Sequence, residues 1–181
     1  MIESKNELFD NLMLGVCLLG TLSAFGPVAQ AGESQPAYTM TVIADRAQGD
    51  RVVAGDYGQA IAQIAAETGK RSDQFAVSNN LCVAYTKLND LPKAEVACSE
   101  ALRISKEMYG SWYDSDRKRN YHALALSNRG VIRAVSGDAQ LAREDFLRAR
   151  RLSDTLAAPS ENLARLEAEM TQTVSSRVSS R

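Results

Sequence analysis

Apolar residues recur every three or four positions through the middle of the chain, and the clearest case spans residues 79–104. Its first half has one apolar face at helical spacing, made of Leu81, Ala84, Tyr85 and Leu88. Asn89 and Asp90 interrupt the pattern, and Pro92 follows where proline suits the first turn of a helix. The second apolar face is made of Ala94, Ala97, Cys98, Ala101, Leu102 and Ile104. The stretch therefore predicts two amphipathic helices joined by a tight turn.

Weaker versions of this pattern lie on both sides. They predict a helix from about residue 44 or 50 to 54 and further helices over about 57–67, 121–135, 138–152 and 159–171. The first helix of the central stretch is expected to begin at about residue 72 and to reach about residue 88. Residues 38–43 are β-branched and extended in character, so residues 32–43 are expected to form a leader or arm ahead of a helical domain at 44–171. Residues 172–181 are expected to be a disordered tail, since they are polar and serine-rich.

Residues 1–31 have the features of a secretory signal peptide. Leu12–Leu22 is an apolar run of suitable length, and Ala29-Gln30-Ala31 is a small-residue cleavage site. Cleavage there would leave a mature chain that begins at Gly32 and lies in the periplasm or outside the cell.

The first ten residues carry one basic and three acidic side chains, where a signal peptide has a positive charge. One explanation is a true start at Met13. An uncleaved membrane anchor and a cytosolic core helix are two further alternatives. Gly, Ser and Pro interrupt the apolar segment, which is also short for a membrane span. Cleaved export is the favoured interpretation, and membrane contact is expected only through an uncleaved N-terminal segment.

The balance of basic and acidic residues argues against nucleic acid as a partner. With 21 basic and 22 acidic residues, the chain has no bulk charge to attract nucleic acid. Its apolar content suits a globular core, and the few prolines suit packed helices. Three cysteines are too few for a fold that depends on disulfides.

Residues 79–104 resemble a tetratricopeptide (TPR) repeat. The matching residues are Asn80, Leu81, Ala84, Tyr85, Asn89, Asp90, Ala94, Cys98, Ala101 and Leu102. Weaker copies lie at 54–61 and 128–149. Asp56 and Asp90 are 34 residues apart, which is the period of this family, whereas Asp90 and Asp138 are 48 apart. The difference places an insert at about 107–120.

This resemblance implies an all-α fold, a right-handed superhelical stack of antiparallel helix hairpins with a short extended N-terminal arm. The first repeat would be degenerate, as terminal repeats often are. The helix at 159–171 would be a solvating cap.

The resemblance also pairs two cysteines. Cys82 and Cys98 fall on facing positions of the two helices of one repeat, and tightly packed helices bring such positions to disulfide distance. In an exported chain the pair would be oxidised. The alternative is two buried free cysteines that act as small hydrophobic residues.

In TPR proteins, partner peptides commonly lie along the concave face made by the first helices. The corresponding partner-binding candidates are Asn79, Val83, Thr86, Lys87, Ser127 and Val131. The Lys, Asn and Arg set of chaperone-tail clamps is absent from the matching positions, so that activity is not expected. The mostly apolar face suits an apolar helix or an extended peptide.

Two other groups have competing interpretations. Aromatic residues in and beside the insert either pack it onto the neighbouring helices or form a partner-binding hot spot; they are Tyr109, Trp112, Tyr113 and Tyr121. A basic stretch near the end of the chain either is a solvated face or contacts an acidic partner or anionic lipid; it comprises Arg143, Arg148, Arg150 and Arg151.

Reaction chemistry is not expected. His122 is the single histidine, and no cysteine or acidic cluster stands at ligand spacing from it, so a zinc site is not expected. His122 is also the one possible histidine base, and no serine is placed as a nucleophile for it to activate. Glu144 and Asp145 are adjacent on a helix and point apart, which predicts a solvated face. No cofactor, metal or catalytic residue is predicted.

The function expected from the resemblance is that of a non-enzymatic periplasmic or envelope adaptor or assembly scaffold that binds a protein or peptide of unknown identity. The alternatives are a self-associating structural subunit of an envelope complex and a membrane-anchored TPR protein.

Overall fold

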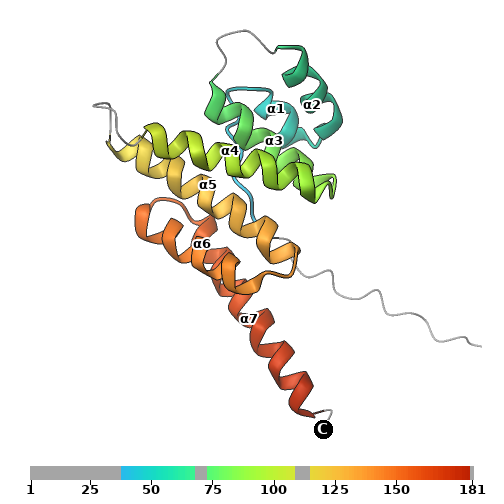
Figure 1. Ribbon diagram of the computed structural model, residues 1–181, viewed down its shortest axis with the longest axis vertical. Helices are drawn as coiled ribbons and strands as arrows, with labels where there is room; N and C mark the ends of the chain where they lie inside the picture. Colours follow the sequence, from blue (N-terminus) through green and yellow to red (C-terminus); the bar gives the residue numbers. More distant parts are fainter. Residues whose placement is uncertain (1–37, 68–72, 109–114, 180–181) are drawn as a thin grey trace, which may run out of the picture. The chain divides into compact units, whose positions relative to one another are not determined.

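The computed structural model describes residues 38–67, 73–108 and 115–179 (Figure 1). These ranges contain α-helices and no strand, which confirms the all-α class for this part of the chain. The helices are α1 (Gly49–Ala54), α2 (Tyr57–Ala66), α3 (Gln74–Lys87), α4 (Leu91–Met108), α5 (Ser115–Val135), α6 (Ala139–Leu152) and α7 (Ala158–Ser179). The proposed signal peptide, the first half of the leader (residues 32–37) and the aromatic residues Tyr109, Trp112 and Tyr113 lie outside the described residues.

The helices form two layers. Each helix packs against the next one in the sequence, and α1, α3, α5 and α7 also contact one another in that order. The odd-numbered helices therefore make one continuous layer, while α2, α4 and α6 cover it from the other side. Short turns join α3 to α4 and α5 to α6, so both pairs are antiparallel hairpins.

The same turn occurs three times. Gly55, Asn89 and Gly137 each adopt a left-handed backbone conformation, with φ of 89°, 58° and 89°. An aspartate follows each of them and donates its backbone N–H to the carbonyl five residues earlier, at 2.8–2.9 Å. This arrangement satisfies carbonyls that a helix end would otherwise leave unpaired. Glycine adopts this φ without strain, and asparagine is the usual substitute.

Small residues allow the two layers to approach closely. Ala60, Ala94 and Ala142 occupy the same position of the helix that follows each turn, and none has any exposed surface. Gly130 of α5 lies against the ring of Phe146 of α6, where a Cβ atom would overlap the ring. Packing at these points leaves no room for a larger side chain.

Cys82 of α3 and Cys98 of α4 form a disulfide, with Cα atoms 4.9 Å apart. The predicted pairing is therefore present in the structure. Both residues are buried among Ala94, Ala97 and Ile132. Closing a loop of this length contributes about 3 kcal/mol on the chain-entropy estimate.

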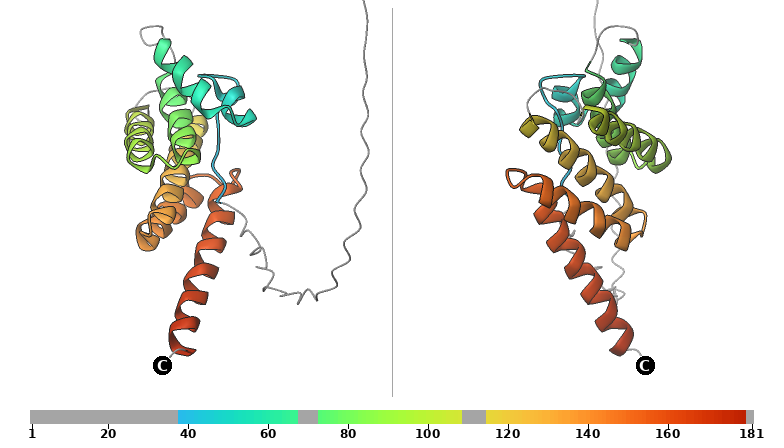
Figure 2. Two further views of the ribbon diagram at one scale, coloured as in Figure 1. Left: turned by 90° about the vertical axis from the view of Figure 1, so that its right-hand side faces the viewer. Right: turned by 60° about the vertical axis from the view of Figure 1, so that its left-hand side comes forward.

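Two predicted boundaries need correction. The proposed insert at 107–120 is partly helical, because α4 continues to Met108 and α5 already begins at Ser115. The proposed disordered tail is helical as far as Ser179. No glycine or proline interrupts the last helix, and hydroxyl groups such as those of Thr171 and Thr173 hydrogen-bond to carbonyls one turn earlier. The end of α7 projects beyond the other helices (Figures 1 and 2).

The prediction that Glu144 and Asp145 form a solvated face is wrong for Asp145. This carboxylate is 1% exposed. Arg129 donates two hydrogen bonds to it, at 2.7 and 2.8 Å, and Arg133 donates a third at 2.7 Å. The burial of Asp145 has no local signal in the sequence, because both arginines come from the neighbouring helix α5. Paired and fully hydrogen-bonded, the charge is compatible with the interior.

Candidate functional site

The residues Tyr38–Ile43, called the N-terminal segment below, form neither helix nor strand. The segment runs along the odd-numbered helices from α7 to α3 (Figure 2). Asn162 of α7, Asn128 of α5 and Asn80 of α3 bind its backbone and are called the asparagine row.

Each asparagine of the row bonds both backbone groups of one residue. The pairs are Thr39 with Asn162 (both bonds 2.8 Å), Thr41 with Asn128 (both 2.9 Å) and Ile43 with Asn80 (both 3.0 Å). In each pair the side-chain oxygen accepts from the N–H and the side-chain nitrogen donates to the C=O. An asparagine amide carries an acceptor and a donor side by side, so it replaces the edge of a neighbouring β-strand.

Every second residue is held because an extended chain repeats its orientation every two residues. The segment therefore has the hydrogen bonding of a strand, although its partners are side chains of helices.

A second layer of contacts fixes the row itself. Asn79 donates to the carbonyl of Thr41 at 3.0 Å and accepts from Asn128 at 2.9 Å. Asn80 donates to the carbonyls of Arg46 and Ala47 as well. All four asparagines are at most 1% exposed. Buried amides of this kind are stable only when their donors and acceptors are paired, so the segment completes the fold as well as occupying the site.

The other residues of the segment insert apolar side chains between the helices. The Tyr38 ring stacks on Phe146 with centroids 6.2 Å apart. Met40 packs against three of the four core clusters. Val42 packs beside Val52 and Val83. The segment is thus bound through its backbone at residues 39, 41 and 43 and through its side chains at residues 38, 40 and 42.

Polar contacts hold the start of the segment. The Tyr38 hydroxyl donates to Glu169 at 2.6 Å, and the Arg165 guanidinium lies 5.0 Å from the ring centroid. Burial and the hydrogen bond to Glu169 raise the pKa of the Tyr38 hydroxyl, so this group stays protonated as a donor at neutral pH. Arg165 also donates to Glu169 at 2.9 Å.

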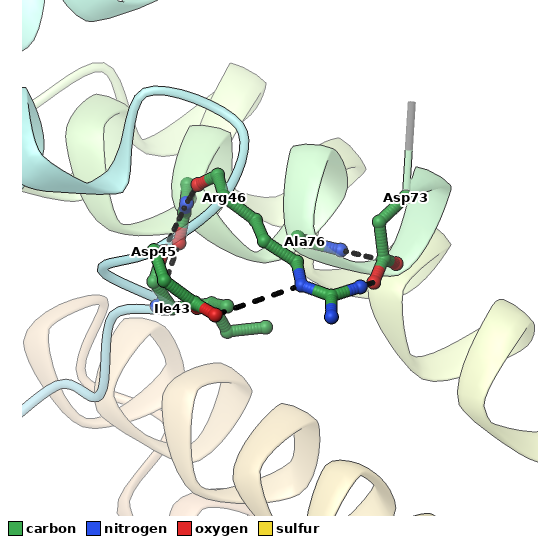
Figure 3. A network of polar contacts seen from close by, with 6 residues as sticks. Ile43, Asp45, Arg46, Asp73 and Ala76 are labelled. Atoms are coloured by element: carbon green, nitrogen blue, oxygen red, sulfur yellow. Dashed lines mark hydrogen bonds and ion pairs between the residues drawn. The ribbon is translucent and has the colours of Figure 1, made fainter. Parts of the chain in front are cut away.

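Contacts with α1 and α3 hold the other end. Figure 3 shows Arg46 extending from the loop after Ile43 to Asp73, which it meets at 3.0 Å. Asp73 also caps α3 by accepting from the backbone N–H of Ala76. Gly49 lies directly against the backbone of Ile43, where a Cβ atom would overlap the carbonyl group. The glycine therefore permits the closest approach between the segment and α1.

The predicted partner-binding residues fall into three groups. Four are buried beside the N-terminal segment or its asparagines, with exposed fractions of 0–2%; they are Asn79, Val83, Ser127 and Val131. Thr86 is partly buried and donates its hydroxyl to the carbonyl of Cys82, while Lys87 is exposed. Trp112 and Tyr113 are outside the described residues. Binding of a separate partner by any of them stays a prediction.

The asparagine row itself was not predicted as a site. Asn80 and Asn128 match the repeat pattern, and Asn162 lies outside the residues that carry the resemblance. The spacing carries a signal, because Asn128 and Asn162 are 34 residues apart and Asn80 and Asn128 are 48 apart. These are the same 34- and 48-residue intervals that separate the three aspartates of the turns. One asparagine therefore recurs at an equivalent place on α3, α5 and α7.

The described residues hold no cluster of three or more potential metal ligands. Within them, no helix is both long and apolar enough to cross a membrane. Comparison of the chain with family models, curated proteins and solved structures finds no match.

Proposed function

We propose that the chain is a TPR-type scaffold that binds an extended protein segment along its odd-numbered helices. The three equivalent turns, the alternating layers and the 34-residue spacings support the TPR assignment. The observation that carries the proposal is the asparagine row, which forms six hydrogen bonds to the N–H and C=O groups of alternate residues.

This mode of binding recognises an extended backbone whatever its sequence, because every residue except proline offers the same two groups. Selectivity comes from the side chains between the bonded residues. An aromatic residue at the place of Tyr38 and apolar residues at the places of Met40 and Val42 fit the contacts described above. The class of partner is therefore an extended segment with alternating apolar residues.

The N-terminal segment occupies the site in the described state, so an external partner has to replace it. The buried asparagines require a hydrogen-bonding occupant, which makes exchange of one extended segment for another the natural route of binding. Under this proposal the N-terminal segment competes with an external partner for the asparagine row. The partner binds only if its affinity for the row is high enough to displace the segment. The predicted cleavage after Ala31 would place this exchange in the periplasm or outside the cell.

The test is binding of a fluorescent peptide with the sequence of residues 37–47 to the full chain and to its Thr41→Pro variant. Proline removes the N–H that Asn128 accepts but leaves the asparagine row intact. We expect the peptide to bind the variant about tenfold or more tightly than the unchanged chain. Thr41→Ala retains the N–H and is the matched control.

A peptide N-methylated at Thr41 tests the same hydrogen bond by a change in the peptide. It should lose most of its affinity for the Thr41→Pro variant. N-methylation at Met40 is the control. Equal binding by the two methylated peptides, or no binding to the Thr41→Pro variant, would contradict the proposal.

Self-association is a second candidate, because the N-terminal segment of another copy offers the same groups. Ala47 and Gln48, in the loop between the segment and α1, have φ of 49° and 58°. Such conformations cost free energy in non-glycine residues, and release from the loop would relieve it. Light scattering should then show that the molar mass of the unchanged chain rises from that of a monomer to that of a dimer as the protein concentration increases. The Thr41→Pro variant should stay monomeric.

A further inference from the structure

A basic pocket lies between α4, α5 and α6, and the N-terminal segment contributes no side chain to its lining. Its lining residues are Lys106, His122, Arg148, Arg151 and Leu152, and its volume is about 370 Å³. This volume lies within the range of small-molecule sites, roughly 300–1,000 Å³. Three cationic side chains from two helices therefore converge on a space large enough for a small organic molecule.

A histidine forms the inner part of this pocket. His122 is only 8% exposed, and its Nδ1 lies 2.9 Å from the Ser105 hydroxyl oxygen. Because the Ser105 hydroxyl donates its proton to the Leu102 carbonyl at 2.8 Å, Nδ1–H of the histidine must be the donor to Ser105. The imidazole is thus held in one tautomer and one orientation.

Among the described residues, no carboxylate neutralises the three cations of the pocket. The side chains of Lys106, Arg148 and Arg151 form no ion pair with any carboxylate in the described ranges. Two arginines further along α5 differ, since Arg129 and Arg133 are both bound to Asp145. Burial, followed by the charges of Lys106, Arg148 and Arg129, lowers the pKa of His122. The histidine thus lies in a positive field with contributions from α4, α5 and α6.

We propose that this pocket binds a small molecule through an oxyanion group, either a phosphate or a carboxylate. Arg148 and Arg151 offer planar guanidinium groups that pair with two oxygens at once, and Lys106 adds a compact charge from the opposite helix. Leu152 supplies an apolar wall for the rest of the molecule. The anion removes the mutual repulsion of the cations and favours protonation of His122.

The single histidine provides a direct probe, since its imidazole signals in an NMR spectrum of untagged protein need no assignment. Pyrophosphate and citrate are titrated separately into the full chain at constant ionic strength, with chloride as the reference salt. Pyrophosphate represents phosphate ligands and citrate represents carboxylate ligands. We expect at least one of them to produce a saturable shift of the His122 signals and a higher His122 pKa at saturation.

The variants Arg148→Gln and Arg151→Gln should each weaken binding about tenfold. Arg150→Gln is the matched control, because Arg150 lies on the same helix and is exposed but does not line the pocket. Saturation by pyrophosphate alone assigns a phosphate ligand, and saturation by citrate alone assigns a carboxylate ligand. A response that does not saturate with either anion, or equal losses in all three variants, would overturn the proposal.

Discussion

The asparagine row and the basic pocket are built partly on the same helix and follow opposite rules. Asn128 of α5 is buried and forms hydrogen bonds to Thr41 and Asn79. Two turns earlier, His122 faces a pocket whose cations have no carboxylate partner in the described residues. The row consists of neutral groups that are paired within the chain. The pocket is lined by the cations of Lys106, Arg148 and Arg151, which form no ion pair with a carboxylate of the described residues.

This difference separates stability from ligand binding. A paired, buried amide contributes to the free energy of folding, and its loss leaves other groups unpaired. An unpaired, solvated cation contributes little to folding but keeps its full capacity to bind an anion. Substitutions in the row should therefore lower stability strongly, and substitutions of the pocket's lysine and arginines should weaken anion binding with little loss of stability.

The largest effect is expected for Asn128→Ala. The substitution leaves the Thr41 N–H and the Asn79 side-chain oxygen without their partner inside the protein. We expect the free energy of unfolding to fall by about 2–4 kcal/mol, measured by urea denaturation.

Asn120→Ala is the control for this variant, because Asn120 lies on the same helix and is partly exposed. It should change the free energy of unfolding by no more than about 0.5 kcal/mol. Equal losses in the two variants would show that the helix, and not the asparagine row, is the sensitive element.

The next effect is expected for Gly49→Ala, which changes no asparagine. The new Cβ atom would overlap the carbonyl of Ile43 and push the N-terminal segment away from α1. Overpacking of this kind costs about 1–3 kcal/mol. Urea denaturation measures the loss, and hydrogen exchange of the Thr41 and Ile43 amides shows whether the segment has loosened.

Gly58→Ala is the matched control, since a Cβ atom at that helical position has nothing within 4 Å. Alanine is the better helix former, so this variant should gain up to about 1 kcal/mol. The prediction would be wrong if Gly49→Ala were as stable as the unchanged chain and its Thr41 and Ile43 amides stayed protected from exchange. The backbone at Gly49 and Ile43 would then have room for the added methyl group.

The difference between the two sites also explains what could be predicted. Helical periodicity and the turn residues located the helices, because both signals are local in the sequence. The Cys82–Cys98 pairing followed from one repeat, whose helices are adjacent. The segment at 38–43 showed its extended character locally, but nothing local showed what would bind it.

The asparagine row depends on residues up to 123 positions from their partners, so no window of the sequence contains both. Its signal is the repetition of one asparagine at the repeat spacing, and it is visible only when the repeats are aligned with one another. The burial of Asp145 was missed for a similar reason, since the arginines that compensate its charge lie on another helix. The basic pocket was seen only in part, as a basic stretch without Lys106 or His122.

Acidification tests the pocket by its effect on stability. The environment of His122 lowers its pKa below the ordinary value of 6.5, so the unfolded chain binds this proton more readily than the folded chain. The contribution of His122 to stability is therefore complete above pH 6.5 and is lost as the pH falls below that value. Urea midpoints measured from pH 7.5 to 5.5 should decline, and His122→Asn should reduce the decline. A decline that is unchanged in His122→Asn would assign the pH dependence to other groups.

The smallest effect on stability is expected for Arg148→Gln, and the absence of a loss is its informative result. Arg148 is exposed, and its charge is one of those that lower the pKa of His122. Removing this charge should change the free energy of unfolding by no more than about 0.5 kcal/mol.

Arg148→Gln should also raise the pKa of His122, because the protonated imidazole then has one fewer cation beside it. NMR titration of the single histidine measures the pKa, and Arg150→Gln, whose charge is not among those causes, should leave it unchanged. A large loss of stability in Arg148→Gln would show that its guanidinium is part of the packing, and the contrast between a site that holds the fold together and a site kept open for a ligand would then fail.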